Sequence, residues 1–144
     1  MIVIADRPEA VAAWVAGQLG IQLTLPLQAI GFAAENGRLL GGAVFTGFNG
    51  FNVDITIAGH GCMTRGNLQT VYTYVFGQLG CERMTARVRR SNLPMRRLLE
   101  THPWLGFRQE GMQRRYWGPT EHDDVIVYGV LRSDFRFASA ALAA

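Results

Sequence analysis

Two Asn-Gly dipeptides, Asn36-Gly37 and Asn49-Gly50, are the feature that most constrains the fold of this chain. Asn-Gly favours a type I′ hairpin turn, because both central residues of that turn need a positive φ. The dipeptides separate three strand-like runs, which cover residues 28–35, 38–48 and 51–58. The sequence therefore predicts a three-stranded antiparallel meander in the middle of the chain.

A strand–helix–strand segment continues from this meander. Apolar residues from Leu68 to Leu79 recur at helical spacing, and Gly80 provides a stop. Residues 83–90 then alternate between apolar and polar side chains, which is the pattern of a strand. Parallel strands need a crossover connection, which is usually a helix. A strand–helix–strand crossover added to an antiparallel meander therefore predicts a mixed sheet.

Two more helices are expected on either side of these elements. Residues 8–19 are predicted to form a helix with Asp6 as its N-cap and Gly20 as its end. Asn92 is predicted to cap a short helix that carries Pro94 in its first turn.

The last third of the chain adds strands within residues 106–117 and 124–132. The complete order predicts an α+β domain whose sheet is mixed, mostly antiparallel and twisted, with helices on both faces. This domain should cover residues 1–137, and residues 138–144 should be a loose tail.

Composition places the chain among ordered globular proteins, with 49% hydrophobic and 17% charged residues. Two cysteines are too few for a disulfide framework, so we expect a reducing, cytoplasmic setting. Pro26 interrupts the uncharged stretch of residues 10–34, which argues against a membrane span. The single H-x-C pair at His60 and Cys62 does not predict a metal site.

Arginine supplies every basic side chain, since the chain contains no lysine among its 14 Lys and Arg residues. Nine of the arginines lie between Arg83 and Arg115. The net charge of +3 suits a polyanionic partner, but it does not by itself indicate nucleic-acid binding.

An ordered set of short motifs occupies the second half of the chain. It comprises the Asn92-led helix, Leu105-Gly106-Phe107, Glu110-Gly111, and Asp124 with Tyr128 and Leu131. In this order and spacing, the set resembles the GNAT superfamily of N-acyltransferases, and especially its branch of ribosomal-protein N-terminal acetyltransferases. The predicted order of elements agrees with that fold, in which two neighbouring parallel strands splay apart. The resemblance implies that residues 51–58 and 83–90 form this parallel pair here.

The resemblance implies a site for acetyl-CoA between the splayed strands, with the pyrophosphate at the N-terminus of the following helix. Backbone N–H groups near Ile57 would stabilise the oxyanion, and Asn92 would contact the pantetheine arm. The residues implied as cofactor-binding are Ile57, Gly59, Thr64, Arg65, Gly66, Asn67, Asn92 and Arg96.

The turn before that helix departs from the pattern of the family. Counting back from Gly80 places the small residues of the usual glycine signature at Met63 and Arg65. Gly59, Gly61 and Gly66 would have to supply a shifted turn. The alternative is a capped turn with Arg65 in solvent.

Amine acetylation needs a base for the ammonium and an acid for the leaving thiolate. Asp54 is the predicted base, with Glu35 and Glu110 as further candidates; a solvated carboxylate is the alternative for Asp54. Leu99 occupies the position where many family members carry a tyrosine, which would serve as the acid. Tyr116 is the predicted acid in its place, with Tyr128 and His102 as the other candidates; packing in the core or the sheet is the alternative for both tyrosines.

The resulting hypothesis is an N-acetyltransferase that moves an acetyl group from acetyl-CoA to a primary amine by direct attack in a ternary complex. The amine could belong to a protein N-terminus, a lysine or a small molecule. The alternatives are a catalytically silent binding module and a nucleic-acid-binding module that uses residues 83–115. A homodimer stays open, since an exposed Trp104 or Trp117 would indicate a dimer surface.

Overall fold

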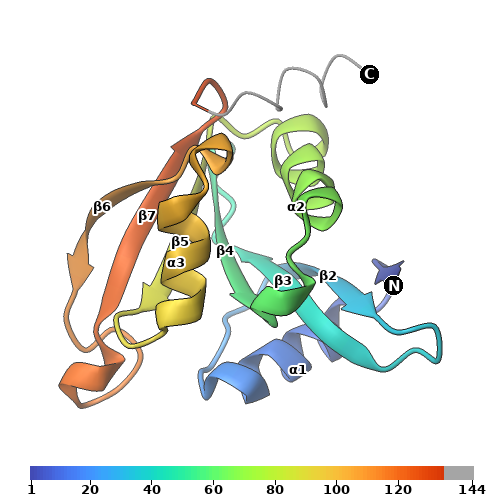
Figure 1. The fold of residues 1–144 in the computed structure, drawn as a ribbon, viewed down its shortest axis with the longest axis horizontal. Coiled ribbons are helices and arrows are strands. Elements are labelled where there is room, and N and C mark those ends of the chain that lie inside the picture. The colour runs from blue at the N-terminus through green and yellow to red at the C-terminus, as the bar shows by residue number, and fades with distance from the viewer. Residues whose placement is uncertain (135–144) are drawn as a thin grey trace.

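The computed structural model describes residues 1–134, so the predicted C-terminal tail lies outside the described residues. Figure 1 shows the arrangement of the elements. The strands are β1 (Ile2–Ile4), β2 (Leu27–Ala33), β3 (Leu39–Thr46), β4 (Asn52–Ala58), β5 (Arg83–Arg89), β6 (Arg108–Gln113) and β7 (Val125–Leu131). The helices are α1 (Pro8–Leu19), α2 (Arg65–Tyr72) and α3 (Leu93–Thr101), with short helical turns η1 (His60–Cys62), η2 (Thr73–Gln78), η3 (Pro103–Leu105) and η4 (Glu121–Asp123).

The strands form one seven-stranded sheet in the order β1-β2-β3-β4-β5-β7-β6. Its pairs are antiparallel apart from β4 and β5, which run parallel in the centre. The predicted α+β class and the predicted parallel pair are confirmed.

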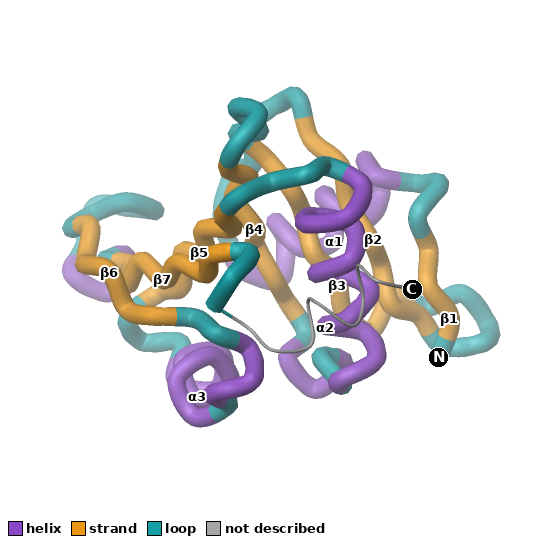
Figure 2. Tube along the Cα trace, turned by 90° about the horizontal axis from the view of Figure 1, so that it is seen from above, coloured by secondary structure: helices purple, strands orange, loops and turns teal. Residues whose placement is uncertain are grey.

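Helices cover both faces of the sheet, as Figures 1 and 2 show. On one face, Val11 and Val15 of α1 pack against Ala29, Val44 and Ala58. On the other face, α2 and α3 cover a larger apolar cluster. The buried residues of that cluster include Leu68, Val71, Tyr72, Val75 and Phe76, all predicted from the helical spacing.

The meander is confirmed, but the predicted type I′ turns are wrong. Among the described residues only Arg115 and glycines have a positive φ, so Asn36 and Asn49 do not adopt the required conformation. Gly37 takes a φ of 87° and Gly50 a φ of 95°. The loop of residues 34–38 has one glycine with a positive φ, Gly37, and the loop of residues 47–51 has two, Gly47 and Gly50.

Two helix boundaries also differ from the prediction. The N-cap of α1 is Arg7, with no side-chain hydrogen bond, so Asp6 is not the cap. Gly20 ends α1 with a φ of 64°, as expected. The helix predicted through Leu79 changes after Tyr72 into the π-helical turn η2. Propensity patterns do not distinguish these two kinds of turn.

Candidate functional site

The central strands β4 and β5 separate along their length. The two strands pair from Asn52 opposite Arg83 to Ile55 opposite Ala86. Among the described residues, their hydrogen-bonded ladder ends at this last pair. Both strands continue beyond this point, to Ala58 and Arg89. Figure 1 shows them diverging in that direction. The predicted splayed pair is therefore present.

A narrow cavity of about 30 Å³ lies where the strands diverge, and we call it the slot. Its apolar lining comes mostly from β4, β5 and α3, and also from the end of α1 and the loop after β6. These apolar residues are Ile55, Ile57, Ala86, Val88, Met95, Leu99, Leu19 and Trp117. Asn92 also lines the slot, and its side-chain oxygen accepts a hydrogen bond of 3.3 Å from the N–H of Met95. The prediction that Asn92 caps α3 is confirmed. The cap places this side chain at the slot.

Arg89 also lines the slot and has several partners. Its guanidinium donates hydrogen bonds to the carbonyl oxygens of Leu19 and Gly20, at the end of α1. Its Nε lies 3.6 Å from a carboxylate oxygen of Asp123, and its guanidinium lies 5.5 Å from the ring centroid of Trp117. Arg89 thus joins α1 to the loop between β6 and β7.

Asp123 is held in its ionised form by this loop. The backbone N–H of Thr120 is the main cause that lowers the pKa of Asp123, and Arg89 adds to the effect. Hydrogen bonds to a carboxylate favour its charged form. Arg89 therefore meets a negative partner.

A second cavity of about 190 Å³ adjoins the slot on the α1 side of the sheet, and we call it the basin. The two cavities share Ile55, Arg87 and Trp117. Asp54 and Tyr116, the predicted base and acid, both line the basin. Thr46, Thr56 and residues 22–24 complete its wall. The structure thus brings the two catalytic candidates together beside the slot.

Asp54 is held by two neighbours. One carboxylate oxygen lies 2.9 Å from Nη1 of Arg87, and the other accepts a hydrogen bond of 3.1 Å from Asn52. The side chain of Asp54 keeps 29% of its exposure, so the carboxylate is accessible. Asp54 is therefore neither an isolated solvated group nor a buried one.

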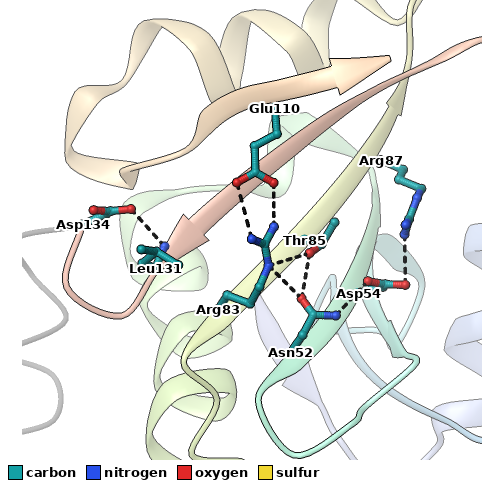
Figure 3. A network of polar contacts seen from close by, with 8 residues as sticks. All are labelled: Asn52, Asp54, Arg83, Thr85, Arg87, Glu110, Leu131 and Asp134. Carbon is teal, nitrogen blue, oxygen red and sulfur yellow. Dashed lines mark hydrogen bonds and ion pairs between the residues drawn. The ribbon is translucent and has the colours of Figure 1, made fainter. Parts of the chain in front are cut away.

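A polar network continues from Asp54 along the paired part of the strands (Figure 3). The side-chain oxygen of Asn52 accepts hydrogen bonds from Thr85, at 2.7 Å, and from Nε of Arg83, at 3.3 Å. Arg83 in turn forms an ion pair of 2.6 Å with Glu110. Glu110 is thus engaged with Arg83, away from the residues that line the basin.

Arg87 has anchors besides Asp54. Its Nε donates a hydrogen bond of 2.9 Å to the side-chain oxygen of Gln113 on β6. Its guanidinium also lies 5.0 Å from the ring centroid of Tyr116. Sequence reasoning missed Arg87 and Arg89 as site residues, although their alternation with Val88 placed both on one face of the strand.

The residues predicted to bind the pyrophosphate gather at the start of α2, outside the slot lining. Thr64 caps the helix by accepting a hydrogen bond of 3.2 Å from the N–H of Asn67. The side chain of Asn67 donates to the carbonyl of Cys62, at 2.6 Å. Arg65 is exposed, and its guanidinium lies 5.2 Å from the centroid of the Trp104 ring, so the alternative of a capped turn with Arg65 at the surface also fits this geometry.

Two glycines near this turn, Gly59 and Gly66, do not line the slot. Gly59 has a φ of 80°, and a Cβ there would lie 2.3 Å from the carbonyl oxygen of Leu40. Close packing against β3 thus requires glycine at this position. Gly66 lines a different cavity of about 520 Å³ between α2 and β2. Met63 is buried in the core.

Arg96 and Tyr128 form a separate cluster with Glu100. Arg96 donates to the carbonyl of Arg90, at 2.9 Å, and lies 3.5 Å from Glu100. The Tyr128 hydroxyl donates to Glu100 at 2.8 Å. Burial, followed by this hydrogen bond, raises the pKa of Tyr128 to about 12. Neither Arg96 nor Tyr128 is among the residues that line the slot.

The arginine-rich segment is largely neutralised by acidic partners. Six of its nine arginines form ion pairs, namely Arg83, Arg87, Arg89, Arg96, Arg108 and Arg115. A continuous basic surface of the kind that tracks a phosphate backbone needs unpaired cations. This pairing weighs against the nucleic-acid alternative.

Two other classes of site involve metal ions and membranes. No group of three or more His, Cys, Asp or Glu residues within residues 1–134 is arranged to hold a metal ion. No helix in the same range has the length and apolar character needed to cross a membrane.

Comparisons with known proteins bear on the fold. No family model matches this sequence, and no curated protein matches it. Solved structures do match. The spermidine/spermine N-acetyltransferase SpeG from Vibrio cholerae is 14% identical, with a TM-score of 0.67 over 92% of this chain and 92% of that chain. The ribosomal-protein-S5-alanine acetyltransferase from Vibrio fischeri is 13% identical, with a TM-score of 0.65 over 93% of this chain and 94% of that one.

A further match, a probable acetyltransferase, is 20% identical, with a TM-score of 0.62 over 77% of this chain and 64% of that chain. The chain has the GNAT fold. The resemblance read from the motifs of the second half is thus confirmed at the level of fold.

Proposed function

We propose that this protein is an N-acetyltransferase that moves an acetyl group from acetyl-CoA to a primary amine, by direct attack in a ternary complex. The observation that supports this most is the end of the β4–β5 ladder at Ile55, with the slot on one side and Asp54 in the adjoining basin. Donor and acceptor would meet where the two cavities join. The two cysteines are free and buried, which suits a cytoplasmic setting.

The lining of the slot is chemically suited to the slender pantetheine arm, although the slot itself is narrow. Most of its lining is apolar. Ile57 lies where β4 has left β5, so backbone groups there can bind an amide or an oxyanion. A volume of about 30 Å³ corresponds to about one water molecule. The arm would therefore enter by displacing flexible side chains such as Met95.

The start of α2 suits the diphosphate electrostatically. The first turn of this helix contains no acidic residue, and Arg65 lies in it. Helix N-termini attract anions through their N–H groups and dipole. In this proposal Thr64, Arg65, Gly66 and Asn67 contact the phosphates, and Gly59 allows the close turn before them. Asn92 contacts the arm, and Arg96 the outer part of the nucleotide.

Acetyl-CoA supplies the acetyl group as a thioester, and the protein supplies the proton transfers. Asp54 accepts a proton from the ammonium and so makes the nitrogen nucleophilic. Backbone N–H groups near Ile57 stabilise the developing oxyanion. Tyr116, at the basin, is the candidate donor of a proton to the departing sulfur.

A catalytically silent binding module is the second candidate. It is favoured by Leu99, an apolar residue that lines the slot at the position where many family members carry a tyrosine. The small volume of the slot also favours it.

Thermal shift and thiol release distinguish these candidates. Acetyl-CoA at 100 times its dissociation constant should stabilise the protein by about 2.7 kcal/mol. With an amine present, the enzyme should release free CoA thiol. Asp54→Asn should lower kcat/KM at least roughly 100-fold, while acetyl-CoA still binds.

The remaining outcomes of this test decide between the two candidates. Binding without thiol release on any class of primary amine would assign the silent module. No stabilisation by acetyl-CoA or CoA would remove the transferase and favour a silent module that does not bind CoA.

A further inference from the structure

The basin contains a balanced pair of charges. Among the described residues that line it, Asp54 carries the one negative charge and Arg87 the one positive charge. These groups lie 2.9 Å apart, with side-chain exposures of 29% and 21%. Both are accessible from the basin, so an incoming molecule meets a carboxylate and a guanidinium side by side.

This balance disfavours an acceptor with several positive charges. Each ammonium beyond the first would lie near Arg87 without a carboxylate to compensate it, because Asp54 is the one carboxylate among the described residues that line the basin. Uncompensated like charges in an interface cost free energy and act against binding. The basin is thus poorly suited to a polyamine, the substrate class that names the SpeG neighbours.

Arg87 and Asp54 are each held independently of the other. Gln113 and the ring of Tyr116 fix the guanidinium, and Asn52 fixes the carboxylate. A ligand could therefore separate the pair without leaving either side chain disordered. An arginine fork fixed in this way is suited to a carboxylate, which it can bind through two parallel hydrogen bonds.

We propose that the acceptor is a small primary amine that also carries a carboxylate, as a free amino acid does. Its ammonium binds Asp54 and its carboxylate binds Arg87, so one internal ion pair is exchanged for two intermolecular ones. The basin volume of about 190 Å³ favours an acceptor smaller than a drug-sized ligand, since pockets for such ligands measure about 300–1,000 Å³. This inference rests on the proposed acetyltransferase function.

The transfer balances in this arrangement. The ammonium gives one proton to Asp54, and the freed nitrogen lone pair forms the N–C bond to the acetyl carbon. The C–S bond breaks, and the sulfur keeps its electron pair. The second proton lost by the nitrogen reaches the sulfur by way of Tyr116, and Asp54 returns its proton to water.

Acceptor selectivity tests the proposal. Purified protein is given acetyl-CoA and one of four acceptors, namely free amino acids, the same amino acids as C-terminal amides, dipeptides with an acidic second residue, and spermidine. Free CoA thiol reports turnover. The chain has no lysine, so it adds no side-chain amine of its own as a competing acceptor.

The expected result is a preference of roughly 100-fold in kcat/KM for the amino acid over its amide, corresponding to the loss of one charge-assisted contact of about 2.8 kcal/mol. Arg87→Gln should reduce that ratio to within a few-fold of one. Arg108→Gln is the matched control, because Arg108 is an ion-paired arginine on β6 that does not line the basin. The control should keep the ratio of the wild type, and melting temperatures should show that both variants fold.

Three outcomes would overturn the proposal. Equal use of amides or spermidine, or an unchanged ratio in Arg87→Gln, would refute the acceptor class while acetyl-CoA binding and thiol release still support the transferase. Activity confined to the acidic dipeptides would assign the site to peptide N-termini. No acetyl-CoA binding and no thiol release with any amine would refute the proposed function itself.

Discussion

The two ends of the β4–β5 pair are built by different forces, although they belong to the same two strands. From Asn52 to Ile55, backbone hydrogen bonds and a polar side-chain network hold the strands together. Beyond Ile55 the strands separate, and apolar side chains of α3 fill most of the space between them.

The difference shows how one sheet can contain both a fixed hinge and an opening. A polar network has strict distance requirements and keeps the paired end closed. Apolar packing between Leu99, Met95 and the strands is non-directional, so a bound ligand can replace some of these side-chain contacts. The open end can therefore exchange side-chain contacts for a ligand while the paired end keeps its register.

Removing apolar volume at the open end should have the largest effect. Leu99 is 2% exposed, and Leu99→Ala should lower the free energy of unfolding by about 3 kcal/mol through lost burial and a residual cavity. Leu99→Met, which keeps the volume, should cost less than about 1.5 kcal/mol. Urea unfolding measures both. Equal costs for the two variants would show that packing does not stabilise this end.

Adding volume at the open end should instead affect the ligand. Ile57→Trp places a larger side chain in the slot, so acetyl-CoA affinity should fall roughly 100-fold, or about 2.8 kcal/mol, by calorimetry. Ile57→Leu is the control and should change affinity only a few-fold. If Ile57→Trp folds and binds normally, the donor does not use the slot.

A substitution at the paired end should change the free energy of unfolding but not the affinity for acetyl-CoA. Thr85→Val removes the hydroxyl that donates to Asn52, so the free energy of unfolding should fall by about 1 kcal/mol, while acetyl-CoA affinity stays the same. Thr56 on the open part of β4 is equally buried, at 7% exposure, and its hydroxyl makes no hydrogen bond among the described residues. Thr56→Val should therefore be nearly neutral. A binding defect in Thr85→Val would mean that the two ends are coupled.

The smallest effect is expected at Asp124, outside both ends, in the loop that carries Tyr116. The backbone N–H of Arg115 is the main cause that lowers the pKa of Asp124, and the Arg115 side chain contributes. A carboxylate with a lowered folded-state pKa stabilises the protein above its unfolded pKa of about 3.9, and that contribution is lost as the pH falls through the folded value.

Urea midpoints measured against pH test this dependence. Wild type should be more stable than Asp124→Asn at pH 7, and the gap should shrink as the pH falls below about 4. A constant gap would show that ionisation of Asp124 does not contribute.

Local patterns in the sequence predicted most of the fold. The meander, the crossover, the Asn92 cap and the buried residues of α2 follow from turn chemistry and periodicity, and each is confirmed. The turn types and the Asp6 cap were wrong because neighbouring backbone contacts decide them. The π-helical turn at η2 has no propensity signal of its own.

The sequence predicts the site less completely than it predicts the fold. Asp54 and Tyr116 were proposed separately, and only the strand order, with β7 between β5 and β6, brings the loop after β6 to the basin. The ion pairs of Arg87 and Arg89 link residues far apart in the chain, which spacing alone does not indicate. The pyrophosphate site stays a prediction, since the resemblance supplies most of its support.

Arg89 has a consequence for motion. One planar side chain touches the last carbonyls of the first helix, a carboxylate near residue 123 and an indole near residue 117, so segments separated by about a hundred residues of chain share a single attachment. A displacement of any one of them would disturb the contacts that Arg89 makes with the other two. Acceptor arrival on one side of the sheet and widening of the donor passage on the other would then be parts of one mechanical event.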